Sequence, residues 1–225
     1  MNATSAKLPH DPITHRAVHI TYRLAGSIPK GQLAILRSRR DRALARLEVS
    51  LLGVPEPLYT ENWNKQTYHI NVNYELAVEE VLHQGGTGPR HLGRDDIACL
   101  VLQSWLTLHE RQAIFLYAVC IMSNHVHVVL QAPGGVEQVA IGKLMKAHKG
   151  YTARMANRLL GTTGKSFWAN TYFDRRVRRG RFMRVMWYVI NNPVKAGLVS
   201  DWQQWPYTYV SPQCREMFTG VLEEE

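Results

Sequence analysis

The pattern of hydrophobic and polar positions predicts both strands and helices along most of the chain. Strands are expected at residues 16–25, 113–122 and 125–132, where β-branched and aromatic residues fill strand-sized lengths. Helices are expected at residues 32–52, 95–108, 136–160 and 181–191, where apolar residues recur at helical spacing. Ser123-Asn124 supplies a turn, so the strands on either side of it are expected to pair as a hairpin.

This order of elements indicates an α+β fold, with an antiparallel sheet and helices packed on one face. A chain of 225 residues with 45% hydrophobic residues is long and apolar enough to build a core. No apolar run approaches the roughly 20 residues that cross a bilayer, and the first residues lack the pattern of a secretory signal. We therefore expect a cytoplasmic protein that does not enter a membrane.

The cysteine content and the net charge narrow the possible functions further. The three cysteines are scattered and lack CxxC spacing, which indicates neither a disulfide framework nor a cysteine zinc site. The net charge is +9, and residues 141–184 alone contain twelve Lys and Arg against the single acidic residue Asp174. A solvated basic surface would explain a mixed-sign run, but charge this one-sided favours a nucleic-acid partner.

His125 and His127 are the first pair of residues that could form a functional site. Residues two apart on a strand point to the same face, so both imidazoles are expected to project together. Such a pair suits a divalent cation and leaves coordination positions open for a phosphate. Ordinary hydrogen bonding is the alternative, and the pair alone does not decide between them.

Tyr188 and Asn192 lie four residues apart and so share one face of the last predicted helix. A tyrosine hydroxyl beside a metal-polarised phosphodiester can attack phosphorus, and Asn192 could supply an oxygen to the same cation. Tyr188 could equally be an apolar core residue of an amphipathic helix. Tyr172, in a basic stretch, is the second candidate nucleophile, and Tyr151 is a more distant third.

Three stretches of sequence together resemble the REP-associated tyrosine transposases, single-tyrosine members of the His-hydrophobic-His superfamily of IS200-like DNA-nicking enzymes. They are MSNHVHVVLQ from Met122, KSFWANTYFDRRVR from Lys165 and YVINNPVKAGLVSDWQQWPYTY from Tyr188. By motif order the resemblance covers roughly residues 16–26 and 95–210.

The resemblance implies a ferredoxin-like domain that binds single-stranded DNA, recognises an imperfect REP-type hairpin and cleaves beside it with Mg²⁺ or Mn²⁺. His125 and His127 match the metal-binding pair, Asn192 the third ligand and Tyr188 the nucleophile, which would form a 5′-phosphotyrosine and release a 3′ hydroxyl. The chain would then be a site-specific endonuclease and strand transferase, a transposase associated with the nucleoid.

The basic stretch would contact the DNA, because cations beside aromatic side chains neutralise phosphates and stack on bases. Phe167 and Trp168 are expected to belong to the core instead. The expected DNA-binding residues are Arg175, Arg176, Arg178, Arg179, Arg181, Lys165, Lys149 and Tyr172.

The chain departs from the compact members of this family over residues 30–94, which we interpret as a helical segment inserted within a single domain of residues 1–225. Compact relatives act as monomers and insertion-sequence relatives as homodimers that exchange the tyrosine helix, so both states stay open. Two other functions also stay open: a catalytically inactive regulator that binds hairpin DNA, and an RNA-binding module.

Overall fold

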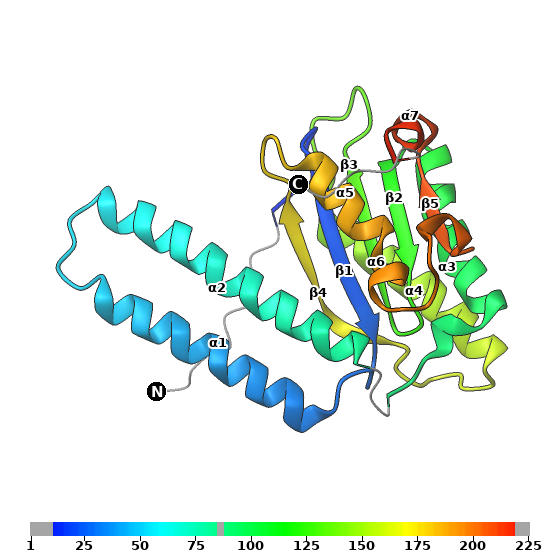
Figure 1. Cartoon of the computed structure of the whole chain (residues 1–225), viewed down its shortest axis with the longest axis horizontal. Helices are drawn as coiled ribbons and strands as arrows, with labels where there is room; N and C mark the ends of the chain where they lie inside the picture. The colour runs from blue at the N-terminus through cyan, green and yellow to red at the C-terminus, as the bar shows by residue number, and fades with distance from the viewer. Residues whose placement is uncertain (1–10, 85–87, 219–225) are drawn as a thin grey trace. The chain divides into compact units, whose positions relative to one another are not determined.

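The computed structural model describes residues 11–84 and 88–218 (Figure 1). These residues group into two compact units, one with the described residues up to Leu24 and from Arg90 onward, the other with those from Ala25 to Pro89. The second unit holds α1 (Lys30–Ser50) and α2 (Leu58–His83). The first holds β1 (Val18–Leu24), α3 (Asp95–Glu110), β2 (Phe115–Ile121), β3 (His125–Gln131), α4 (Ile141–Leu159), β4 (Trp168–Arg176), α5 (Phe182–Ile190), α6 (Asn192–Lys195), β5 (Thr208–Val210) and α7 (Pro212–Arg215).

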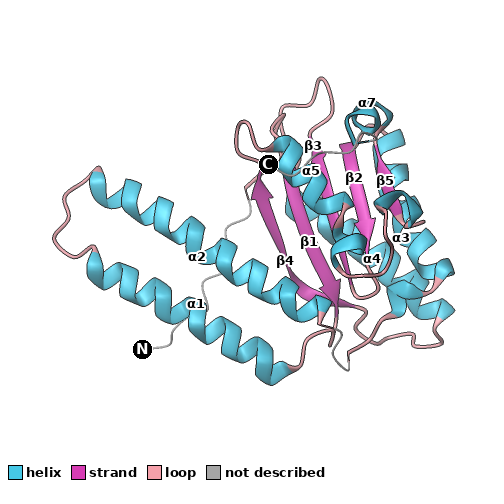
Figure 2. Ribbon diagram, viewed as in Figure 1, coloured by secondary structure: helices cyan, strands magenta, loops and turns pink. Residues whose placement is uncertain are grey.

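A five-stranded sheet forms the frame of the first unit, in the order β4-β1-β3-β2-β5, and every neighbouring pair is antiparallel (Figure 2). The α+β fold class with an antiparallel sheet is confirmed. β2 and β3 form the predicted hairpin, and the Met122 amide donates to the carbonyl of His125 at 2.9 Å across its turn. The chain order β1, α3, β2, β3, α4, β4 is the ferredoxin-like arrangement.

Helices pack against both faces of this sheet. One face meets α3 and α4 in a core that includes Ile20, Trp105 and Leu130. The other face meets α5, whose buried Met186 packs in one cluster with Val129 of β3. The expectation of helices on one face therefore describes α3 and α4 only, because the apolar side of α5 covers the second face. Strand alternation sends Leu130 and Val129 to these opposite faces.

Hydrogen bonds link α3, β1 and α4 inside the first core. Trp105 Nε1 donates to Tyr22 Oη at 2.9 Å, Tyr22 Oη lies 2.7 Å from Nε2 of His148, and Nδ1 of His148 lies 2.9 Å from Ser104 Oγ. The Tyr22 hydroxyl accepts from the indole and can donate its own proton to Nε2 of neutral His148, whose Nδ1–H then donates to Ser104. Burial lowers the pKa of His148 to about 3, which keeps the imidazole neutral as this arrangement requires.

β4 and β5 are strands that the sequence pattern does not predict. Only Trp168 is buried among the nine residues of β4, which is an edge strand, so its apolar alternation is weak. β5 has three residues, too few for a pattern to emerge. The basic end of β4, Arg175 and Arg176, is typical of an edge strand that resists pairing with other chains.

The second unit is a helical hairpin. α1 confirms the helix predicted over residues 32–52, while α2 is much longer than the short helix that the sequence indicated around residues 76–82. The two helices contact each other through side chains such as Arg40 of α1, whose guanidinium lies 5.1 Å from the ring centroid of Tyr74 of α2. Neither these helices nor any other helix in the described residues is long and apolar enough to cross a membrane.

Candidate active site

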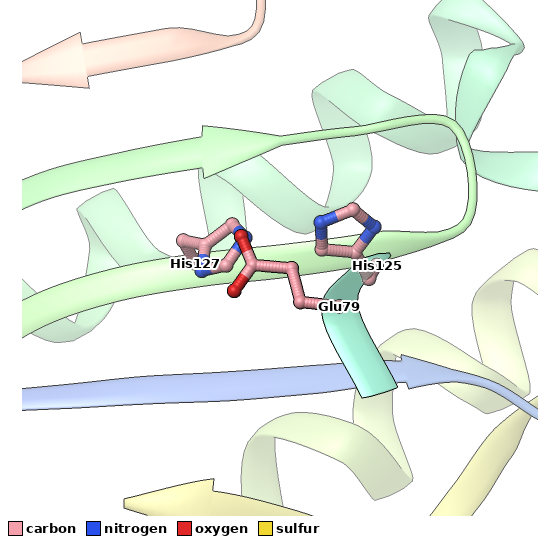
Figure 3. Close-up of side chains that lie close together, drawn as sticks. All are labelled: Glu79, His125 and His127. Atoms are coloured by element: carbon pink, nitrogen blue, oxygen red, sulfur yellow. The ribbon is translucent and has the colours of Figure 1, made fainter. Parts of the chain in front are cut away.

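His125 and His127 project from the same face of β3 (Figure 3). This is the face that α5 covers. Their ring centroids are 4.8 Å apart with the planes at 83°, and each ring has a ligand nitrogen within 4.8 Å of one on the other ring. Antiparallel pairing with β1 sets Arg23 opposite His125 and Thr21 opposite His127. The spacing that the sequence offered therefore brings two imidazoles together on one side of the sheet.

The Nδ1 atoms of both imidazoles lie within hydrogen-bond distance of neighbouring side chains. Nδ1 of His125 lies 2.7 Å from the Asn124 side-chain oxygen, to which it can only donate. Nδ1 of His127 lies 3.2 Å from Thr21 Oγ1 and 3.1 Å from Nε2 of His19. Because Nδ1 is engaged in each ring, Nε2 is the nitrogen that each would offer to a cation. This donor set fits the divalent ion that the sequence resemblance implies.

Tyr188 lies beside this histidine pair in the same chain. Its ring centroid is 6.0 Å from that of His127, edge-on at 84°, and also 6.0 Å from that of His19. α5 fixes this position because Met186, Val189 and Ile190 are buried against the sheet while Tyr188 is only partly buried at the rim of that cluster. The two imidazoles and the phenol therefore lie close together within one chain.

Asn192 and Lys195 follow Tyr188 in the short helix α6. Asn192 is fully buried, and its Nδ2 donates to the carbonyl of Tyr188 at 3.2 Å, which secures the turn between α5 and α6. Oδ1 is the Asn192 atom that could serve a cation. Lys195, exposed, holds its ammonium 5.3 Å from the centroid of the Tyr188 ring. The sequence pattern missed Lys195, although its seven-residue spacing from Tyr188 corresponds to two helical turns.

Tyr172 and Lys149 belong to the opposite side of the sheet. Tyr172 pairs with Tyr22 across β4 and β1 and packs against the α3–α4 core. Burial, and then the nearby Asp174, raises the pKa of Tyr172 to about 12. Lys149 of α4 donates to the carbonyl of Ala169 at 2.7 Å and lies 5.8 Å from the Tyr172 ring centroid. The second candidate nucleophile therefore faces away from the histidines.

The remaining expected DNA-binding residues cluster around β4 and the loop before α5. Arg175 pairs directly with His19 of β1, which places it on the histidine face of the edge strand. Arg176 ends β4, and the others are exposed in the flanking loops. Phe167 and Trp168 are buried in the core, as expected. The loop residues are Lys165 before β4 and Arg178, Arg179 and Arg181 after it.

His19 is the neighbour of the pair that the sequence pattern did not single out. It lies on β1, two residues before Thr21 and on the same face. The signal available in the sequence was the alternation His19, Thr21, Arg23 within an otherwise apolar strand, which marks a polar face. What it could not show was that this face lies beside β3, since that pairing joins residues 108 positions apart.

The comparisons with known proteins agree with this architecture. A family model described as "Transposase IS200 like" matches residues 93–192, the segment with both histidines, Tyr188 and Asn192. A solved REP-associated tyrosine transposase bound to a REP hairpin matches with a TM-score of 0.50 at 11% identity, over 97% of this chain and 88% of that one. That likeness concerns the fold.

A crystal structure of a candidate transposase from Deinococcus radiodurans R1 matches with a TM-score of 0.36 at 14% identity, over 83% of this chain and 98% of that one. No curated protein matches the chain. The family model confirms the resemblance to the IS200-like transposases for residues 93–192.

Proposed function

We propose that this chain is a site-specific single-stranded DNA endonuclease and strand transferase that uses Tyr188 as its nucleophile. The observation that carries the proposal is the position of the Tyr188 ring, 6.0 Å from the ring of His127 within one chain. A phenol and a pair of imidazoles beside each other suit attack on a phosphodiester. The single-chain arrangement supports an enzyme that is active as a monomer.

The reaction follows from the chemistry of these groups. Tyr188 Oη forms a bond to phosphorus while the bond from phosphorus to the 3′ oxygen breaks, the phenol proton passes to solvent, and the departing oxygen is protonated to a 3′ hydroxyl. His125 and His127, with Asn192 as third ligand, would hold Mg²⁺ or Mn²⁺, which when bound supplies Lewis-acid polarisation of the phosphate. Attack by a 3′ hydroxyl on the phosphotyrosine reverses the step and joins strands.

Lys195 and helix α5 would also assist the attack by Tyr188. The ammonium of Lys195, close to the Tyr188 ring, would attract the negatively charged phosphate that approaches it. α5 holds the phenol in place before the DNA binds, because its apolar residues are packed on the sheet. Such preorganisation lowers the entropic cost of reaching the reactive geometry.

The substrate is proposed to be single-stranded DNA that carries a REP-type hairpin. Support comes from the basic residues on and around β4, from Lys165 to Arg184, and from the hairpin that the structurally similar transposase binds. Arg175 at the histidine face and the exposed arginines of the following loop could lead the strand toward Tyr188. Lys149 and Tyr172, on the helix side, would instead brace β4 against α4.

The salt dependence of DNA binding tests this assignment. Neutralising Arg176 and Arg179 together (Arg176→Ala, Arg179→Ala) should lower the slope of log K against log salt by about 1.4, since each phosphate contact to a single strand contributes roughly 0.7. Fluorescence anisotropy with a labelled hairpin measures the slope. The matched control, Lys143→Ala with Lys146→Ala on α4, removes the same charge from the opposite layer and should leave it unchanged.

Incubation of the protein with single-stranded hairpin DNA and Mn²⁺ tests the function itself. A covalent adduct that survives SDS, and that EDTA prevents, is the expected result. A protein that binds the hairpin tightly but gives neither adduct nor nick would be the inactive regulator. Preference for RNA of the same sequence, again without an adduct, would favour the RNA-binding module.

A further inference from the structure

Two polar atoms approach Nδ1 of His127, on the side of the ring away from the nitrogen that a cation would use. Nε2 of His19 lies 3.1 Å from Nδ1 of His127, Thr21 Oγ1 lies 3.2 Å from the same Nδ1, and Thr21 Oγ1 lies 3.4 Å from Nε2 of His19. The His19 and His127 rings are nearly parallel, at 14°. All three side chains are buried, so these contacts are sheltered from water.

Proton accounting permits one arrangement of these contacts in which His127 can bind a cation. A neutral imidazole carries one ring proton, and Nε2 of His127 offers a lone pair only if that proton is on Nδ1. The Nδ1–H then donates to Nε2 of His19, with Thr21 Oγ1 as a second acceptor. This requires His19 to carry its own proton on Nδ1, so that its Nε2 accepts.

We infer that His19 and Thr21 are positioning residues that hold His127 in its Nδ1–H tautomer and orient its ring toward the cation. The inference deepens the proposed function and rests on it for the role of the cation. Neither residue needs to touch DNA or metal, since each acts through His127. Partners of this kind set the tautomer and basicity of metal-binding histidines, and their loss typically weakens metal affinity by about 10–100-fold.

The test compares variants at His19 for Mn²⁺ affinity, measured on the DNA-free full chain by isothermal titration calorimetry. His19→Phe keeps a flat ring but removes the acceptor, and should weaken Mn²⁺ binding by roughly 10-fold or more. His19→Gln places an amide oxygen near the position of the lost nitrogen and should largely restore binding. His109→Phe, on α3 across the sheet, is the matched control and should bind as the wild type does.

A second measurement reports the tautomer directly, without metal or DNA. Long-range ¹H–¹⁵N NMR spectra, assigned with His127→Gln, should show the Nδ1–H form of His127 in the wild type and loss of that form in His19→Phe. Thr21→Val removes only a hydroxyl and should shift both readouts in the same direction by less. Thermal unfolding of each variant separates a local effect from general loss of structure.

The proposal is overturned if folded His19→Phe retains both the wild-type Mn²⁺ affinity and the Nδ1–H tautomer, or if His19→Gln is as impaired as His19→Phe. If His19→Phe does not fold, Thr21→Val decides instead. The proposal is then overturned if Thr21→Val keeps both the wild-type Mn²⁺ affinity and the wild-type tautomer of His127. Failure of the proposed function looks different. In that case His127→Ala would bind Mn²⁺ as the wild type does, while the tautomer spectra would still decide the role of His19.

Discussion

Tyr188→Phe should abolish the SDS-resistant adduct between the protein and hairpin DNA. The substitution removes one oxygen and keeps the aromatic ring, so the edge-on contacts with His127 and His19 should persist. Only the bond-forming atom is lost. Removal of an enzyme nucleophile lowers the rate by more than about 10⁴-fold, which places residual adduct below detection on a denaturing gel.

Tyr172→Phe is the matched control for this experiment. It makes the same one-atom change in a tyrosine on the other side of the sheet, where burial and Asp174 hold the pKa of the phenol at about 12. We expect the adduct to form at the wild-type level. Adduct formation by Tyr188→Phe, or its loss in Tyr172→Phe with binding retained, would reassign the nucleophile and refute the geometry proposed above.

Affinity for the hairpin separates chemistry from recognition in the same series. Tyr188→Phe should bind hairpin DNA about as tightly as the wild type, because the arginines around β4 are untouched. A large loss of affinity would show instead that Tyr188 holds the DNA. Circular dichroism spectra of the two tyrosine variants should match that of the wild type, since neither substitution leaves a cavity.

Local pattern predicted the elements whose apolar residues repeat strongly. α3, α4, α5 and the β2–β3 hairpin follow from spacing, and the common orientation of His125 and His127 follows from the two-residue period of a strand. β4 did not follow, because an edge strand with one buried residue carries little apolar alternation. Its pairing with β1 is set by the rest of the sheet.

The candidate site depends on pairings between segments distant in sequence. That His19 reaches His127 is a consequence of β1 pairing with β3, and that Tyr188 reaches His127 is a consequence of α5 crossing the second face of the sheet. The periodicity of a single segment cannot predict either of these two contacts. The resemblance to known transposases supplied the pairing of His127 with Tyr188, but it carried no indication for His19 or Lys195.

The alternation of β4 also shows why composition alone does not tell which side chains of a basic stretch share a face with the histidines. Tyr172 and Arg175 belong to one basic, aromatic stretch, yet their odd spacing sends them to opposite faces. Arg175 meets the histidine face, whereas Tyr172 meets α4 and Lys149. A stretch of sequence that looks uniformly suited to nucleic acid therefore divides into a face on the side of the histidines and a face against the core.

Acid should destabilise the protein through His148, far from the candidate site. Burial, with a further contribution from Lys149, lowers the pKa of His148 to about 3 in the folded chain, against roughly 6.5 when the chain is unfolded. Between these values the unfolded chain binds a proton that the folded chain excludes. The contribution of neutral His148 to stability is therefore present above pH 6.5 and is lost as the pH falls toward 3.

The expected size of this effect is large for one side chain. Lowering the pH from 7 to 4.5 should remove about 2.5 kcal/mol from the free energy of unfolding, against a total of roughly 5–15 kcal/mol for a typical protein. His148→Gln isolates it, because an amide can accept from Tyr22 and donate to Ser104 but does not titrate. Urea denaturation at both pH values should show the stability gap between wild type and His148→Gln narrow by that amount in acid.

His109→Gln is the matched substitution, at the end of α3 in a partly exposed position. The difference in free energy of unfolding between the wild type and this variant should not change with pH. Subtracting variant from wild type at each pH cancels the titration of every other group, including the histidines of the candidate site. A gap for His148→Gln that stays constant between pH 7 and 4.5 would mean that the folded core accepts the proton. The hydrogen bonds from Trp105 through Tyr22 to Ser104 would then have to rearrange around an imidazolium, which can only donate.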